Sequence, residues 1–190
     1  MRVVLTAAVI AMLLLTLRWI RKSESITVTA EKGITVSLLV LYIIAVLFIT
    51  LGPTLGNRRF DYETHLILNP FHGYTVMFRS FAQGFSSGGF PELWKHIGWY
   101  KHQMSGMALN VLLFVPLGYL VPSICVFFRR WWKVLLLGAV ASLTIETTQL
   151  ITHLGWFDAS DLLHNTLGTL IGYALYKKLL YKETTRTQGS

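Results

Sequence analysis

The sequence predicts an all-α integral membrane protein with about five transmembrane helices and an interfacial amphipathic helix in the loop after the second span. Of its 190 residues, 53% are hydrophobic and 14% are charged, whereas soluble domains carry roughly 25% charged residues. One core cannot bury several long apolar runs in a chain of this length. The composition therefore excludes a soluble enzyme or a nucleic-acid-binding domain, although the net charge is +8.

Five apolar segments are each long enough to cross a bilayer, since a hydrocarbon layer of roughly 30 Å needs about 20 helical residues. They run over residues 3–20, 34–51, 106–128, 132–154 and 162–180. We expect the first to be retained rather than cleaved as a signal peptide, because its cations follow the apolar run. Residues 1–52 are thus expected to hold two spans, residues 106–180 a three-helix core, and residues 181–190 a disordered cytoplasmic tail.

The cations of the short connections predict an orientation. Three of these regions are rich in lysine and arginine, and they are residues 18–32, residues 129–133 and residues 177–186. The positive-inside rule places all three in the cytoplasm. The connection over residues 155–161 has two aspartates and neither lysine nor arginine. We therefore expect the N-terminus outside and the C-terminus in the cytoplasm.

The long second connection, residues 53–105, is expected on the outer side. Within it, residues 90–104 predict an amphipathic helix lying in the membrane interface, with Pro91 in its first turn. Its apolar face would comprise Phe90, Leu93, Trp94, Ile97 and Met104. Residues 84–89 (GFSSGG) predict a flexible joint before it. Earlier in the loop, Arg58 and Arg59 are either contacts for lipid phosphate or a solvated, snorkelling pair.

Polar side chains inside the predicted spans are the main candidates for a functional site. They are Asn110 on the third span, Glu146 and Gln149 on the fourth, and Asp158, Asp161 and Asn165 at the start of the fifth. Separations of three and four residues place the candidates of each helix on one face of that helix. The predicted helix directions place all six in the outer third of the membrane. A charged group at mid-bilayer costs roughly 2.5–3.5 kcal/mol, so such residues need a partner or a function.

Each candidate also has a structural alternative. Glu146 is either part of a functional site or a side chain that hydrogen-bonds across helices to hold the bundle together. Asp158 or Asp161 is either a ligand contact or a cap for the fifth helix. Asn110 and Asn165 are either ligand contacts or inter-helix donors.

Two further patterns concern helix packing and metal binding. Gly168 and Gly172 form a GxxxG pattern that predicts close helix packing. A metal site that includes His153 and His164 is conceivable, but no compact signature such as HExxH is present. Cys125 is the only cysteine, so no intramolecular disulfide and no Cys-based metal cluster forms. We expect neither a metal nor another cofactor.

The polar residues of the last three spans resemble a known family in their order and spacing. The matching positions are Asn110-x3-Phe114-x-Pro116-Leu117-Gly118, Ser142-x3-Glu146-x2-Gln149 and Asp158-x2-Asp161-x3-Asn165-x2-Gly168-x3-Gly172. This set is similar to the VanZ-like family of bacterial membrane proteins, over roughly residues 57–176. The segment 68–71 resembles a shortened form of a family patch, and Arg58 or Arg59 matches the arginine before it. The founding member of that family is associated with teicoplanin resistance.

The resemblance implies a protein of the bacterial cell membrane that modulates the cell envelope or glycopeptide susceptibility. A lipid or a lipid-linked envelope precursor would bind in an outer-leaflet cavity lined by the six polar residues, and Arg58 and Arg59 would meet its phosphate. One alternative is an intramembrane enzyme that uses Glu146 and Asp161 as acid and base. Another is a proton-coupled transporter, which a homo-oligomer through Gly168 and Gly172 would favour. We expect no nucleic-acid partner.

Overall fold

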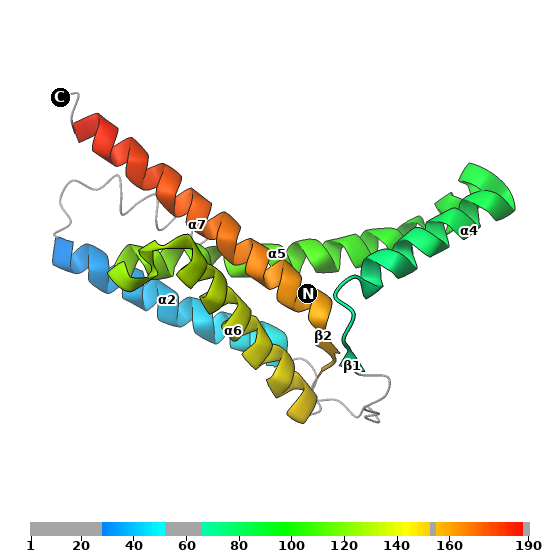
Figure 1. The fold of residues 1–190 in the computed structure, drawn as a ribbon, viewed down its shortest axis with the longest axis horizontal. Coiled ribbons are helices and arrows are strands. Elements are labelled where there is room, and N and C mark those ends of the chain that lie inside the picture. Colours follow the sequence, from blue (N-terminus) through cyan, green and yellow to red (C-terminus); the bar gives the residue numbers. More distant parts are fainter. Residues whose placement is uncertain (1–27, 52–65, 153–154, 188–190) are drawn as a thin grey trace.

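Nearly all residues that the computed structural model describes, 28–51, 66–152 and 155–187, lie in helices (Figure 1). The helices are α2 (Val28–Leu51), α4 (His72–Lys95), α5 (Ile97–Ile124), α6 (Trp131–Ile151) and α7 (Ala159–Thr187), with a short 3-10 helix, η2 (Val126–Arg129). Two strands, β1 (Leu66–Ile67) and β2 (Phe157–Asp158), are two residues long each. The predicted helical class is confirmed. The expected first span over residues 3–20 lies outside the described residues, as do Arg58, Arg59 and His153.

Within the described residues, three helices are long and apolar enough to cross a membrane: Lys32–Thr50 of α2, the whole of α5 and the whole of α6. They agree with the second, third and fourth predicted spans and confirm a membrane protein. The fifth predicted span lies in α7, which does not meet the same measure of apolarity. The count of five spans therefore stays a prediction.

Helix α7 is polar on the face that it buries and apolar on the face that it exposes. Its buried residues include His164, Asn165 and Thr169, and its exposed residues include Leu163, Leu167, Ile171 and Leu175. In water this arrangement would leave a leucine-rich stripe in solvent and polar groups inside. In an apolar medium such as a bilayer, it is instead favourable to expose the leucines and to bury the polar side chains. The buried polar residues and the charged residues near its C-terminal end together make α7 less apolar than its neighbours.

Helices α5 and α7 run in the same general direction and pack with almost no space between their backbones (Figure 1). A Cβ atom added to Gly168 would lie 2.0 Å from the carbonyl oxygen of Val111, and one added to Gly172 would lie 2.0 Å from that of Val115. The predicted role of this GxxxG pair in close helix packing is thus confirmed, within one chain. Within the chain, α5 covers both glycines. The homo-oligomer expected through them stays a prediction.

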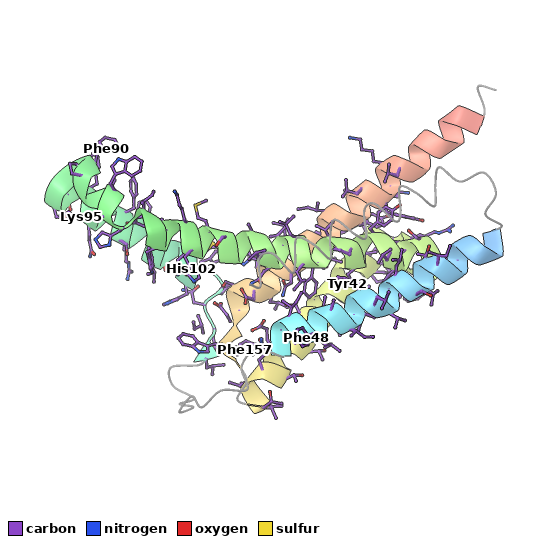
Figure 2. All side chains as sticks on the ribbon, turned by 180° about the vertical axis from the view of Figure 1, so that it is seen from behind. Tyr42, Phe48, Phe90, Lys95, His102 and Phe157 are labelled. Atoms are coloured by element: carbon purple, nitrogen blue, oxygen red, sulfur yellow. The ribbon has the colours of Figure 1, made fainter. Side chains whose placement is uncertain are left out.

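Helix α4 and the first half of α5 form a hairpin that projects away from the bundle, with Phe90 and Lys95 at its far end (Figure 2). The chain turns at Gly89, whose φ of 63° favours glycine, and again at His96 between the two helices. The expected single helix over residues 90–104 is therefore divided between α4 and α5. The expected joint over residues 84–89 is helical up to Gly89, since only that residue leaves helical geometry.

Two other boundaries differ from the sequence-based expectation. Helix α5 begins at Ile97, nine residues before the predicted span, and its 28 residues give it a length of about 42 Å. Helix α7 continues to Thr187 through most of the expected disordered tail. No glycine or proline interrupts residues 173–187, so nothing in the local sequence ends the helix earlier.

A short parallel pairing of β1 with β2 connects the segment before α4 to the turn before α7, with Leu66 opposite Phe157 and Ile67 opposite Asp158. After β1, the Asn69 side chain accepts a 2.9 Å hydrogen bond from the backbone N–H of Phe71, which forms the turn into α4. This pairing places the start of α4 beside the start of α7.

Candidate functional site

A cavity of about 360 Å³ lies at the end of the bundle where α2 and α6 finish and α7 begins. Its walls come from these three helices and from the middle of α5. The polar residues that line it are Thr50, His102, Ser105, Asn110, Glu146, Gln149, Asp161 and Asn165. Five of the six in-membrane residues predicted as ligand contacts therefore meet around one cavity, and only Asp158 does not line it.

Asn110 and Asp161 connect the two most closely packed helices. The Nδ2 group of Asn110, in the middle of α5, donates a hydrogen bond to Oδ1 of Asp161 in the first turn of α7. Asp161 stays about one-third exposed. This contact occupies Oδ1 of Asp161, and the same carboxylate borders the cavity.

Glu146 is buried on α6 and holds the turn that leads into α7. Its Oε2 atom accepts a 2.9 Å hydrogen bond from the backbone N–H of Asp158. Asp158 in turn accepts two hydrogen bonds at Oδ1, from the backbone N–H and from the hydroxyl group of Ser160. Since α7 begins at Ala159, Asp158 is the N-cap of this helix. The capping alternative for Asp158 is confirmed.

The remaining two cavity residues from the prediction each make one inter-helix contact. Gln149 donates from Nε2 to the carbonyl oxygen of Thr50 at 2.9 Å, which connects the ends of α6 and α2. Asn165 is 5% exposed and donates from Nδ2 to the Ser142 hydroxyl group at 2.9 Å. The other polar atom of the Asn165 amide, Oδ1, is buried without a hydrogen-bond partner.

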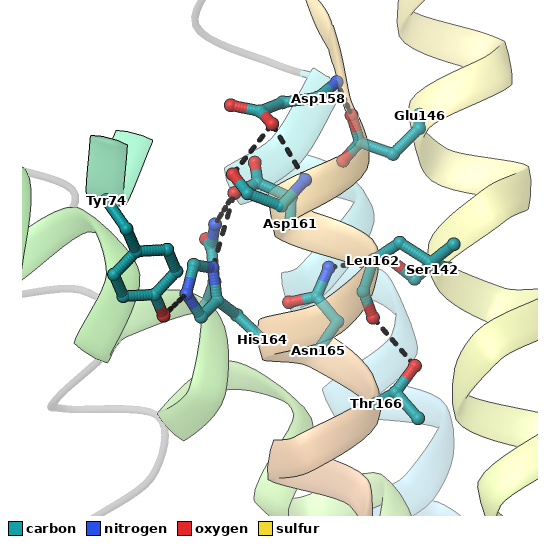
Figure 3. Close-up of polar contacts among 11 residues, drawn as sticks. Tyr74, Ser142, Glu146, Asp158, Asp161, Leu162, His164, Asn165 and Thr166 are labelled. Carbon is teal, nitrogen blue, oxygen red and sulfur yellow. Dashed lines mark hydrogen bonds and ion pairs between the residues drawn. The ribbon is translucent and has the colours of Figure 1, made fainter. Parts of the chain in front are cut away.

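A histidine and a tyrosine extend this polar cluster beyond the cavity (Figure 3). His164 is buried on α7, and its Nε2 atom lies 2.6 Å from the hydroxyl oxygen of Tyr74 on α4. Its Nδ1 atom is 3.9 Å from Oδ1 of Asp161. Side chains from α4, α5 and α7 thus follow one another in the order Tyr74, His164, Asp161 and Asn110.

The charge of the site is acidic. Glu146, Asp158 and Asp161 are the acidic residues whose side chains the structure describes, and all three lie in this cluster. Among the described residues that line the cavity there is neither lysine nor arginine. The described part of the chain also contains no group of three or more His, Cys, Asp or Glu side chains suited to a metal ion. The cavity therefore offers oxygen acceptors for an organic ligand.

Several residues of the cluster were missed by the sequence analysis. His102 and Ser105 belong to the same face of α5 as Leu109 and Asn110, at helical spacing, and this periodicity was a usable signal. Thr50 lies at the end of the second apolar run. Tyr74 carries no sequence signal, because only the tertiary packing of α4 brings it to α7.

A family model described as VanZ/LLP1 matches residues 36–181, which is about three quarters of the chain. The match includes every residue that lines the cavity. No curated protein and no solved structure matches the chain closely. On the strength of the family match, supported by apolar membrane helices around buried polar residues, this chain belongs to the VanZ/LLP1 family.

Proposed function

We propose that this VanZ-family protein binds an envelope component, a lipid or a lipid-linked precursor, in the polar cavity. Binding would alter the envelope and thereby the susceptibility of the cell to glycopeptides such as teicoplanin. The observation that carries the proposal is the convergence of Asn110, Glu146, Gln149, Asp161 and Asn165 on one cavity. Buried polar groups in a membrane protein are costly, and function is the usual reason for keeping them.

The size and position of the cavity support a headgroup as the ligand. About 360 Å³ is at the small end of ligand sites, which run from about 300 to 1,000 Å³. Glu146 is five residues from the end of α6, which is about 7.5 Å along the helix axis. A headgroup therefore reaches the carboxylate without entering the centre of the bilayer. In the proposed orientation, with the C-terminus in the cytoplasm, this is the outer end.

The α4–α5 hairpin would lie on the outer membrane surface beside the cavity. Its exposed aromatic side chains include Phe78, Phe81, Phe85, Phe90 and Trp94. Exposed basic residues, Arg79 and Lys101, accompany them. Aromatic and basic side chains together are typical of a segment at headgroup depth.

The test is glycopeptide susceptibility in a sensitive Gram-positive host that expresses the full chain. Wild type should raise the inhibitory concentration of teicoplanin, whereas Glu146→Gln and Asp161→Asn should abolish the increase at equal membrane abundance. Thr144→Val is the matched control, because Thr144 is exposed on the same helix and does not line the cavity. Well-expressed wild type without any effect on susceptibility would contradict the proposal. Full activity of both variants would show that the cavity is not the functional site.

A further inference from the structure

We infer that the group bound in the cavity is a primary ammonium, an amine that is positively charged and carries N–H donors. This inference rests on the proposed function and specifies which part of the envelope component enters the site. The same chemistry occurs in phospholipid headgroups, such as phosphatidylethanolamine, and in free amines.

The first observation is an unused acceptor. Asn165 lines the cavity at 5% exposure, and its Oδ1 atom has no hydrogen-bond partner. Its Nδ2 group is already bonded to Ser142. A buried amide oxygen without a partner is unfavourable, because it has lost its water and gained nothing in return. A ligand N–H at this point would supply the missing bond.

The second observation is the charge that surrounds this acceptor. The carboxylates of Glu146 and Asp161 border the same cavity, and the described residues that line it include no basic side chain other than His102. An anionic phosphate would meet two acidic side chains there, whereas the N–H groups of an ammonium can donate hydrogen bonds to the carboxyl oxygens of both. These interactions are strong because apolar neighbours, including Leu113 and Ile145, reduce the local dielectric.

The third observation separates a primary ammonium from other cations. Proteins recognise quaternary ammonium groups with cages of aromatic rings, and no Phe, Tyr or Trp is among the described residues that line this cavity. Metal ions need several close ligands, and the described residues hold no suitable cluster of three. Three N–H donors, in contrast, match the acceptors of Asn165, Glu146 and Asp161.

The experiment compares headgroups that differ only in N-methylation. The full chain is reconstituted into phosphatidylglycerol nanodiscs that contain equal fractions of phosphatidylethanolamine, its N,N-dimethyl derivative or phosphatidylcholine. Lipids that remain bound after extraction are counted by native mass spectrometry. We expect retention to fall with each methylation step, and phosphatidylethanolamine to be retained about tenfold or more over phosphatidylcholine, as one charge-assisted hydrogen bond would give. Titration with soluble ethanolamine distinguishes a free amine from a lipid, because only a free-amine site would be saturated by it.

Two variants that replace an acidic group by an amide complete the test. Glu146→Gln and Asp161→Asn each keep an acceptor for the hydrogen bonds of Asp158 and Asn110, so the fold is retained while the acidic group is removed. Each should lose the preference for phosphatidylethanolamine, and Thr144→Val should keep it. Equal retention of all three lipids by wild type, or an unchanged preference in both folded variants, would overturn the inference. Teicoplanin tolerance without ammonium preference would overturn only this inference, and ammonium preference without tolerance would overturn only the proposed function.

Discussion

Asn110 in the middle of α5 donates a side-chain hydrogen bond to Asp161 in the first turn of α7, 51 residues further along the chain. This contact joins the two helices with the closest backbone packing, at the edge of the cavity. The same carboxylate therefore has a structural partner and a place in the candidate site, and the two roles require separate tests.

The structural role of this pair is tested by a double-mutant cycle. Asn110→Ala and Asp161→Ala should show a coupling free energy of about 0.6 kcal/mol or more, up to about 1.7 kcal/mol, since inter-helix hydrogen bonds in membranes have this average and this maximum. The free energy of unfolding of both single variants and the double variant would be measured in mixed micelles. Strict additivity of the two single effects would contradict the hydrogen bond.

Two substitutions of Glu146 are expected to differ in their effect on the free energy of unfolding. Glu146→Gln keeps an oxygen acceptor for the backbone N–H of Asp158, so we expect near-wild-type stability. Glu146→Leu removes that acceptor and should destabilise the protein by about 1–3 kcal/mol, the cost of an unsatisfied buried donor. Hydrogen exchange should become faster at Asp158 in the leucine variant only. Equal exchange in the two variants would show that Glu146 does not hold this turn.

The close packing of α7 against α5 at Gly168 predicts that one added methyl group destabilises the protein strongly. Gly168→Ala places a Cβ atom 2.0 Å from the Val111 carbonyl oxygen, so α5 and α7 must separate. We expect a loss of about 1–3 kcal/mol in the free energy of unfolding. Gly98→Ala is the control, since nothing lies within 4 Å of an added Cβ atom at this position of α5. A Gly168→Ala variant as stable as Gly98→Ala would contradict the packing.

The contact of Tyr74 with His164 is expected to attach the α4–α5 hairpin to the bundle. Tyr74→Phe removes the hydroxyl group that lies 2.6 Å from Nε2 of His164. A single hydrogen bond is worth about 1 kcal/mol, so amide exchange should become faster in the first turns of α4 while the pairing of α5 with α7 is unchanged. Faster exchange throughout the bundle would instead indicate a global loss of stability.

The sequence was sufficient for the helices with continuous apolar runs and for the face on which each polar residue lies. Asn110, Glu146, Gln149, Asp161 and Asn165 were found because ionisable and amide groups are rare in apolar helices, and helical spacing places those of each helix on one side. Their meeting in one cavity depends on the approach of α5 to α7 at Gly168 and Gly172.

The hairpin and the strand pairing were not predictable in the same way. The turn at Gly89 depends on a positive φ at one of two adjacent glycines, and the sequence does not distinguish them. The pairing of Leu66 with Phe157 joins residues 91 positions apart, so no local pattern signals it. Tyr74 reaches His164 only through these two features, which is why Tyr74 was not predicted as a member of the site and His164 was considered only as a conceivable metal ligand.

Covalent filling of the cavity tests the central claim most directly. Ser105→Cys in a Cys125→Ser background places a single thiol in the cavity wall, and a membrane-impermeant methanethiosulfonate added to intact cells would modify it. The account predicts that modification removes teicoplanin tolerance, that a reductant restores it, and that modification of a thiol at Gly98, which is exposed on the hairpin and does not line the cavity, has no such effect. Complete modification at Ser105→Cys with tolerance intact would contradict the claim that this cavity is the functional site.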